Sequence, residues 1–410
     1  MSRHNLLGVV VAFVALSVQP AWAFDPGDFP DRLAYRDAVL SAHPSLAAAE
    51  QALVAADLRR RAATAWPDPM LGVGVAPATI GSGGMPGVEV QLTVPLPTPG
   101  GQRARRAAGD AGVDMANADR QMARVELAAM AMSTWEQRAL VDQALLVNDQ
   151  HSVLLLQLED VARARYAVGV GAAAAPLMAG SERAMVDMDR AMLLADRDMF
   201  DAELAQLLGG GARDAASGSF PDPDEDAPAG HPALAADAAA VKMARADLAM
   251  TRADRWPMLG LMGTWSSMAP DPMARLMVGV EVSVPLQIGA RRSLVAAAEA
   301  DVAAATARQR ATADRVTAEV ARAEADLRRA HTVLDIQRTR LVPLARASLE
   351  SMRAGAASGM DDPDALIAAE RQVREAELGL VRANTAVVLA EIALDMARGR
   401  VALAPSTQPD

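Results

Sequence analysis

The side chains that most often carry catalysis or bind metal are few in this sequence and do not cluster. The chain has five histidines and no cysteine, which excludes disulfides, thiolate metal sites and a cysteine nucleophile. His43 and His231 each precede a proline in matching contexts, which predicts a structural duty, and neither His151 nor His331 has another histidine at metal-ligand spacing. No nucleophile, base and acid follow one another in a recognisable order. We therefore predict no catalytic residue, no metal centre and no cofactor, and the chain is not expected to be an enzyme.

Methionine is a more abundant soft ligand, with 22 residues in the chain. Met185, Met188 and Met192 recur at helical spacing, and such a stripe could in principle bind copper(I) or silver. Methionine more often fills the interfaces between helices, so we interpret this stripe as packing. Gly169 and Gly171 follow a helix rather than a strand, which is not the setting of a nucleotide-binding loop.

Two stretches have the pattern of β-hairpins, residues 70–96 and residues 258–286. Near the end of the first, the polar residues Glu89, Gln91 and Thr93 alternate with valine and leucine. Near the end of the second, Glu281 and Ser283 do the same. A period of two is typical of strands with two unlike faces. If these strands cross a membrane, we expect the valine and leucine face toward lipid and the five polar side chains toward a water-filled lumen.

Almost all of the remaining chain has the composition of helices, in an order that occurs twice: helix, hairpin, very long helix, glycine-rich break, helix. We expect an interruption at His43-Pro44 and a bend at Pro343, with helices at residues 31–64, 101–166, 176–208, 231–255, 290–352 and 363–400. The predicted fold class is thus mainly α with a small β part. Two tandem repeats are predicted at residues 24–218 and 219–402, followed by a disordered tail at residues 403–410.

The N-terminus and the net charge limit the location and the partners. Arg3 precedes an apolar run from Leu6 to Val18 and the small-residue pattern Ala21-Trp22-Ala23, which predicts an export signal over residues 1–23. That run is too short for a stable spanning helix, and no transmembrane helix is predicted after it. The net charge of −11 argues against nucleic acid as a partner.

The hairpins make oligomerisation a condition of any membrane role. Each predicted strand has the length of a transmembrane β-strand, but two hairpins supply too few strands to close a barrel, and open sheet edges are forbidden in a bilayer. Three chains together would supply twelve strands, above the minimum of about eight known for membrane barrels. The alternative is a soluble sheet with one face packed on a core.

Arginines flank both hairpins on their helix side. In a barrel these junctions would lie at one membrane interface, where arginine can reach lipid phosphates. The alternative is that they are solvated helix ends. The basic residues predicted at this interface are Arg59, Arg60, Arg61, Arg103, Arg105, Arg106, Arg291 and Arg292.

The sequence resembles the TolC-like outer membrane efflux proteins. The resemblance covers nearly the whole chain after the export signal and rests on three features: the duplicated helix and hairpin plan, the Val-Pro-Leu that ends both hairpins, and the glycine breaks in both helical halves. The phrase Trp66-Pro67-Asp68-Pro69-Met70-Leu71-Gly72-Val73-Gly74 is similar to the heavy-metal efflux branch. The resemblance implies a homotrimer, with a twelve-stranded outer-membrane barrel continued by a periplasmic α-helical barrel.

The resemblance also implies partners and two further sites. The partners are a periplasmic adaptor protein, an inner-membrane pump of the resistance–nodulation–division type, and outer membrane lipid. The glycine breaks at Gly169, Gly171, Gly355 and Gly359 would be the helical-tip turns on which the adaptor docks.

Carboxylates near the second glycine break would line the closed aperture. Asp361 and Asp364 match the aspartate pair of the family, with Asp362 beside them, and threefold symmetry would make rings of like charge. Pro363 departs from the family pattern, in which the helix continues. An alternative alignment uses Leu366 and Glu370 and leaves Asp362 as a helix N-cap.

The predicted function is the passive outer membrane duct of a tripartite efflux system, exporting heavy-metal cations. Within this function, the alternative cargoes are drugs or a secreted polypeptide. The alternative from another class is a soluble periplasmic coiled-coil adaptor or scaffold.

Overall fold

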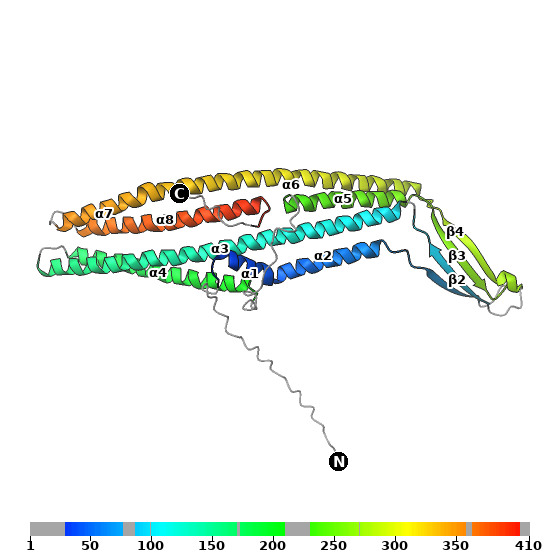
Figure 1. Ribbon diagram of the computed structural model, residues 1–410, viewed down its shortest axis with the longest axis horizontal. Coiled ribbons are helices and arrows are strands. Elements are labelled where there is room, and N and C mark those ends of the chain that lie inside the picture. Colours follow the sequence, from blue (N-terminus) through cyan, green and yellow to red (C-terminus); the bar gives the residue numbers. More distant parts are fainter. Residues whose placement is uncertain are drawn as a thin grey trace, which may run out of the picture.

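Helices and strands occupy separate ends of the molecule. In the computed structural model, long helices run side by side and the strands extend beyond one of their ends (Figure 1). The described residues are 29–76, 87–98, 100–169, 173–209, 230–269, 271–357 and 363–401. The predicted export signal at residues 1–23, the tail at residues 403–410 and the boundary between the repeats after residue 218 lie outside them.

The first copy of the repeat contains α1 (Arg32–Ala42), α2 (Pro44–Ala63), α3 (Gly101–Ala167) and α4 (Ala174–Leu207). The predicted interruption at His43-Pro44 is confirmed, because His43 has an extended backbone between α1 and α2 and its ring nitrogen accepts the amide of Ser45 at 3.2 Å. Pro44 begins α2, where the first turn leaves its amide groups unpaired and a proline costs nothing.

The second copy contains α5 (Pro232–Ala253), α6 (Ile288–Ile336), a π turn η4 (Gln337–Leu341), α7 (Val342–Ala357) and α8 (Pro363–Ala397). His231 repeats the cap of His43: its backbone has φ −67° and ψ 127°, and its ring accepts the amide of Ala233 at 3.1 Å. The duplicated His-Pro pair is therefore a duplicated helix N-cap, which confirms the predicted structural duty of both histidines.

The second long helix is not simply bent at Pro343. Its regular turns are interrupted by the five-residue π turn of η4, which ends two residues before the proline. Proline removes one backbone donor and its ring displaces the preceding turn, and a wider π turn accommodates both effects. Sequence pattern alone located the irregularity but not its form.

Four strands form one antiparallel sheet in the order β1 (Met70–Ala76), β2 (Gly87–Pro95), β3 (Met258–Ser266) and β4 (Leu276–Ser283). A short 3-10 helix, η3 (Pro272–Arg275), connects β3 to β4. The two hairpins join through β2 and β3, with Gln91 opposite Thr264. β1 and β4 are the edges of this sheet.

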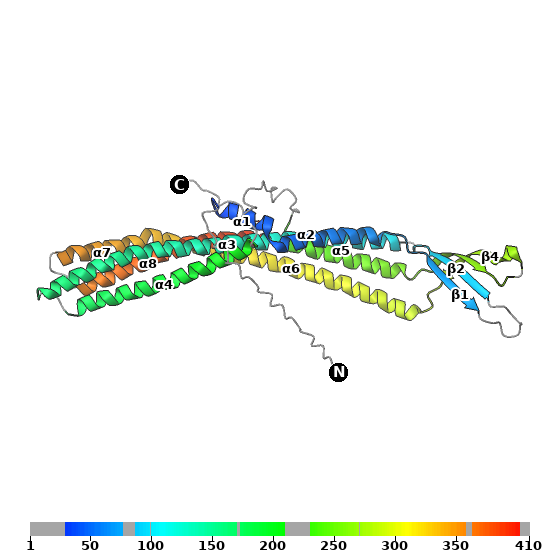
Figure 2. The same ribbon diagram turned by 90° about the horizontal axis from the view of Figure 1, so that it is seen from below.

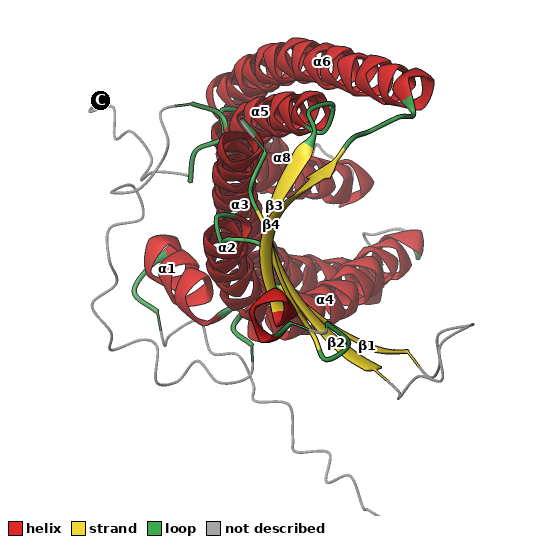
Figure 3. Ribbon diagram, turned by 90° about the vertical axis from the view of Figure 1, so that its right-hand side faces the viewer, coloured by secondary structure: helices red, strands yellow, loops and turns green. Residues whose placement is uncertain are grey.

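The helices form an open, curved array. α3 lies at its centre and packs against α2, α5, α4 and α8, while α6 packs against α5 and α8. In the end-on view the helices trace an arc, with α6 at one end and α2 and α4 toward the other (Figure 3). The sheet and the helix array therefore each have two free edges, and these edges lie on the same two sides of the molecule.

The packing within the array uses mostly alanine and other small side chains, with one larger cluster at the middle of the molecule. There Tyr35 of α1 donates its hydroxyl to the Leu204 carbonyl at 2.9 Å, and its ring lies 5.3 Å from that of Trp135. This cluster fixes α1 against α3 and α4.

Candidate functional site

One face of the sheet is apolar and uncovered. The strand register places Leu71, Leu92 and Val278 in a single row across the sheet, with further rows of valine and leucine on either side. Leu71 is 68% exposed and Val278 is 82% exposed. Two perpendicular views show the strands extending beyond the helices rather than lying beside them (Figures 1 and 2). This apolar face therefore has no cover among the described residues of one copy.

The other face of the sheet is polar. Directly opposite partners across antiparallel strands share a face, and Glu89 lies opposite both Gly74 and Ser266. Glu281 lies opposite Gly260, which in turn lies opposite Pro95. The register brings all five of the predicted lumen residues onto this one face: Glu89, Gln91, Thr93, Glu281 and Ser283.

Among the described residues, neither edge of the sheet has a partner strand. β1 pairs only with β2, and β4 pairs only with β3. Each edge thus presents a row of backbone donors and acceptors that must be satisfied by water or by another chain.

The arginines at the junction of sheet and helices are partly engaged with the protein itself. Arg60 contacts Asp57 at 2.5 Å and Asp110 at 3.5 Å, and Arg61 contacts Asp57 at 2.7 Å. Arg291 donates to the backbone carbonyl of Asp254. Arg59, Arg103, Arg106 and Arg292 are exposed. A groove of about 880 Å³ between α3 and α5 contains Arg103, Arg252 and Trp256 at this end.

The helical tip is the end of the molecule where α3 turns into α4 and α7 into α8. Gly169 adopts a positive φ of 76° at the end of α3, as the turn requires. Gly355 lies in α7. Gly171, Gly359, Asp361 and Asp362 lie outside the described residues, and Asp364 lies in the first turn of α8. The structure therefore does not test the aperture prediction.

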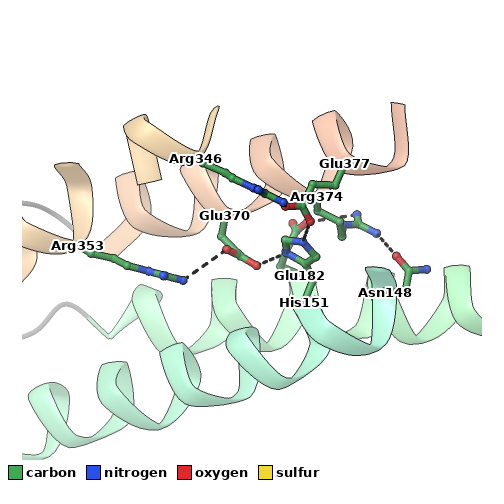
Figure 4. A network of polar contacts seen from close by, with 8 residues as sticks. All are labelled: Asn148, His151, Glu182, Arg346, Arg353, Glu370, Arg374 and Glu377. Carbon is green, nitrogen blue, oxygen red and sulfur yellow. Dashed lines mark hydrogen bonds and ion pairs between the residues drawn. The ribbon is translucent and has the colours of Figure 1, made fainter. Parts of the chain in front are cut away.

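A buried network of charged side chains, which the sequence did not suggest, joins the two repeats in the tip half (Figure 4). His151 of α3 is 3% exposed and lies between two carboxylates of α8: Nδ1 contacts Glu370, and Nε2 lies 2.9 Å from Glu377. Arg346 of α7 binds Glu377 at 2.6 Å. Arg374 of α8 extends in the other direction, to Asp189 of α4 at 2.8 Å and toward Glu182 at 3.7 Å.

The environment of His151 favours its charged form. Burial alone would lower its pKa, but hydrogen bonds to Glu370 and Glu377, and the negative charge of both, outweigh burial and raise the pKa above its ordinary value. Burial likewise opposes ionisation of Glu377, yet His151 and Arg346 hold the pKa of that carboxyl below its usual range. An imidazolium that donates from both nitrogens is the arrangement that fits two carboxylates.

Glu370 also belongs to the alternative alignment of the sequence, the one that uses Leu366 and Glu370. It is 1% exposed and contacts His151, so in a single copy its carboxylate faces the interior of the helix array. The only signal in the sequence was the spacing of Glu370, Arg374 and Glu377, which puts three charges on one side of α8. Nothing in the sequence linked that side to His151, more than two hundred residues earlier.

Within the described residues, histidines and carboxylates form no group that could hold a metal ion. No helix in that part of the chain is long and apolar enough to cross a lipid bilayer.

Comparison with known proteins identifies the fold. Residues 225–400 match the family model described as outer membrane efflux protein. The outer-membrane channel OprN superposes with a TM-score of 0.77 at 20% identity, covering 92% of this chain and 93% of its own. VceC of Vibrio cholerae gives a TM-score of 0.76 at 16% identity, covering 90% of this chain and 96% of its own. CusC gives a TM-score of 0.76 at 17% identity, covering 94% of this chain and 96% of its own. No curated protein matches the sequence.

The chain therefore has the fold of these outer-membrane channels along nearly its whole length. This confirms the predicted fold class, a mainly helical chain with a small sheet and two copies of one plan. The barrel and the trimer involve more than one copy and are taken up next.

Proposed function

We propose that this chain is the outer membrane channel of a tripartite efflux system, a passive homotrimeric duct that exports heavy-metal cations. It resides in the cell outer membrane, and its helices extend into the periplasm. The duct performs no catalysis, and the energy for transport comes from an inner-membrane pump of the resistance–nodulation–division type. A periplasmic adaptor joins the pump to the helical tip.

The observation that carries this proposal is the uncovered apolar face of a sheet with two free edges. In water, that face would leave a large contiguous apolar surface exposed, which monomeric soluble proteins avoid. In a bilayer the same face is stable, provided that every strand edge is paired. A soluble periplasmic adaptor, the rival from another class, would leave both the face and the edges unsatisfied.

The free edges determine how copies assemble. β1 of one copy can pair with β4 of the next, and the helices then meet through the same two sides of the arc. The four strands of one chain are below the minimum of about eight for a membrane barrel. Three copies supply twelve strands, and each free edge finds a partner when the ring closes.

The polar face of the sheet then lines the lumen, where Glu89 and Glu281 attract cations. Arginines at the junction of sheet and helices reach lipid phosphates, and this role falls to the exposed Arg59, Arg103, Arg106 and Arg292 rather than to Arg60, which is held by two aspartates.

At the opposite end, Asp361 and Asp364 form the aperture, while the turns at Gly169, Gly171, Gly355 and Gly359 contact the adaptor. Opening follows from a shift in the packing of α7 and α8 against α3 and α4. The assignment of heavy-metal cations rests on the phrase from Trp66 to Gly74 and on the abundance of methionine. Drugs or a secreted polypeptide are the other outcomes that a test must separate.

The proposal is tested on the full chain expressed with its export signal. We expect it in the outer membrane fraction, as a trimer in mild detergent that dissociates only on heating, and as a conducting channel in planar bilayers. A monomer in the soluble fraction without conductance would contradict the proposal. Sensitivity of a deletion strain to metal salts, compared with its sensitivity to drugs, separates the cargo classes.

A further inference from the structure

The methionines of the sheet are not distributed as apolar residues. β1, β3 and β4 contain four methionines, and the strand register places every one on the polar face. Met70 lies opposite Thr93, which lies opposite Met262. Met258 lies opposite Ser283, and Met277 lies opposite Thr264. On the apolar face, the paired positions hold valine, leucine, one glycine and one tryptophan, and no methionine.

Hydrophobicity alone would predict the reverse. A methionine side chain is apolar and is equally at home among leucine and valine against lipid. Its usual role is to fill irregular gaps between packed elements, but three of these four side chains are mostly exposed, and only Met262 is half-buried, beside Gln91. Met70 is 61% exposed, Met277 is 58% exposed and Met258 is 53% exposed. The property that separates methionine from leucine at such positions is its thioether sulfur.

We infer that the polar face of this sheet is a thioether-lined wall for soft monovalent cations such as copper(I) and silver(I). The inference rests on the proposed function, because it takes this face as the lumen, and it narrows the cargo from heavy-metal cations in general. Thioether sulfur selects soft ions, whereas carboxylates, hydroxyls and water suit hard ions such as Mg²⁺.

The arrangement suits passage rather than storage. Side chains two residues apart along a strand lie on the same face, about 6.8 Å from each other. Met258 and Met262 are four residues apart on β3, at the end of the strand near the helices. Met277 lies one row further out, beside Thr264. Met262 has the side-chain nitrogen of Gln91 at 3.1 Å from its sulfur. Neutral thioethers at several levels along the sheet offer weak sites that an ion can leave as well as enter.

The carboxylates on the same face add to this chemistry. Glu89 and Glu281 share the face with the methionines and supply the negative potential that concentrates any cation. The carboxylates do not distinguish soft from hard cations, whereas the thioether sulfur atoms do. Threefold assembly repeats each methionine around the ring, so a cation on the axis meets three copies of every position.

Silver(I) is the probe, because it binds thioethers without a change of oxidation state. The purified trimer in detergent is dialysed against silver nitrate in chloride-free buffer, and bound silver is measured by mass spectrometry. The sheet variant combines Met70→Leu, Met258→Leu, Met262→Leu and Met277→Leu, which nearly conserve side-chain volume. The control variant changes the exposed methionines of α4, with Met185→Leu, Met188→Leu and Met192→Leu.

We expect the native trimer to bind silver and the sheet variant to bind it about tenfold or more weakly, a typical loss when groups at a metal site are removed. The α4 variant should keep the native affinity. No binding by the native trimer, unchanged binding by the sheet variant, or an equal loss in both variants would each overturn the inference.

Potassium conductance in planar bilayers separates this inference from the proposed function. All three proteins should conduct potassium, since leucine leaves the barrel closed and the lumen open. A conducting trimer whose silver binding does not depend on the sheet methionines overturns the inference and leaves the duct in place. A native chain that forms no conducting trimer overturns the proposed function itself.

Discussion

At the sheet end of the molecule, Leu71 and Val278 leave more than two thirds of their surface exposed to solvent in a single copy. In the tip half of the helices, His151 and Glu370 are almost wholly buried although both side chains are ionisable. The usual distribution of apolar and charged residues is therefore reversed at both places. The apolar face of the sheet is uncovered in a single copy. In the tip half, by contrast, buried charged side chains of the two repeats contact each other.

This contrast assigns different duties to the two ends. In the proposed duct, the uncovered apolar face lies against the hydrocarbon of the bilayer, which fixes the sheet end in place. A buried network of charges depends on geometry and protonation, and a small change in either alters its strength. In the proposed duct, the sheet end that anchors it and the helical half that opens are thus built from opposite kinds of contact.

The largest effect is expected from a charge placed on the apolar face of the sheet. Val280→Arg puts a cation against lipid, at a cost of about 2 to 4 kcal/mol per copy near the bilayer midplane. We expect loss of the heat-dissociable trimer from the outer membrane fraction.

The matched control is Glu281→Arg, at the next residue of the same strand but on the polar face. It should keep the trimer and shift the channel from cation toward anion preference, measured as reversal potential in a salt gradient. If both variants assemble equally, the assignment of the two faces is wrong.

A smaller effect is expected from breaking the network in the tip half. His151→Ala leaves Glu370 buried without its main partner, and an unsatisfied buried group of this kind costs about 1 to 3 kcal/mol. We expect a lower unfolding midpoint of the helical part, followed by circular dichroism, and a higher open probability in bilayers.

The control for this variant is His331→Ala, which removes an exposed histidine from α6. It should leave both the unfolding midpoint and the open probability as in the native protein. Equal behaviour of the two variants would show that the buried network does not hold the repeats together.

The smallest expected effect is the pH dependence of that network. Because the pKa of His151 is raised on folding, its contribution to stability is fully present below 6.5, its ordinary pKa, and is lost as the pH rises through the folded value. Because the pKa of Glu377 is lowered, its contribution is present above 4.5 and is lost as the pH falls through the folded value.

The difference in unfolding midpoint between the native protein and His151→Gln should therefore be largest between these two ordinary pKa values and should shrink under alkaline conditions. A difference that grows as the pH rises would mean that His151 is neutral in the folded protein. The measurement is a pair of melting curves at about pH 5.5 and about pH 9.

The sequence was sufficient for the parts of the fold that depend on local pattern. The alternation of Glu89, Gln91 and Thr93 with valine and leucine predicted a two-faced strand, and the register puts all three on one face. The repeated His-Pro pair predicted a repeated structural duty, and both histidines are N-caps. Each of these signals lies within a few residues of the feature that it predicts.

Features that depend on contacts between distant residues were not predictable in this way. His151 had no partner by spacing, since Glu370 and Glu377 are brought to it by the packing of α8 on α3. The methionines of the sheet became informative only when the register assigned them to a face.

In the proposed duct, β1 of one copy pairs with β4 of the next to close a ring of three. The chain has no cysteine, so Val73→Cys in β1 and Val280→Cys in β4 can be introduced together and bridged in membranes with a flexible bismaleimide. We expect covalent dimers and trimers, and nothing larger, on a denaturing gel, while each single variant stays monomeric. Only monomers from the double variant, or a ladder that continues beyond three copies, would contradict it.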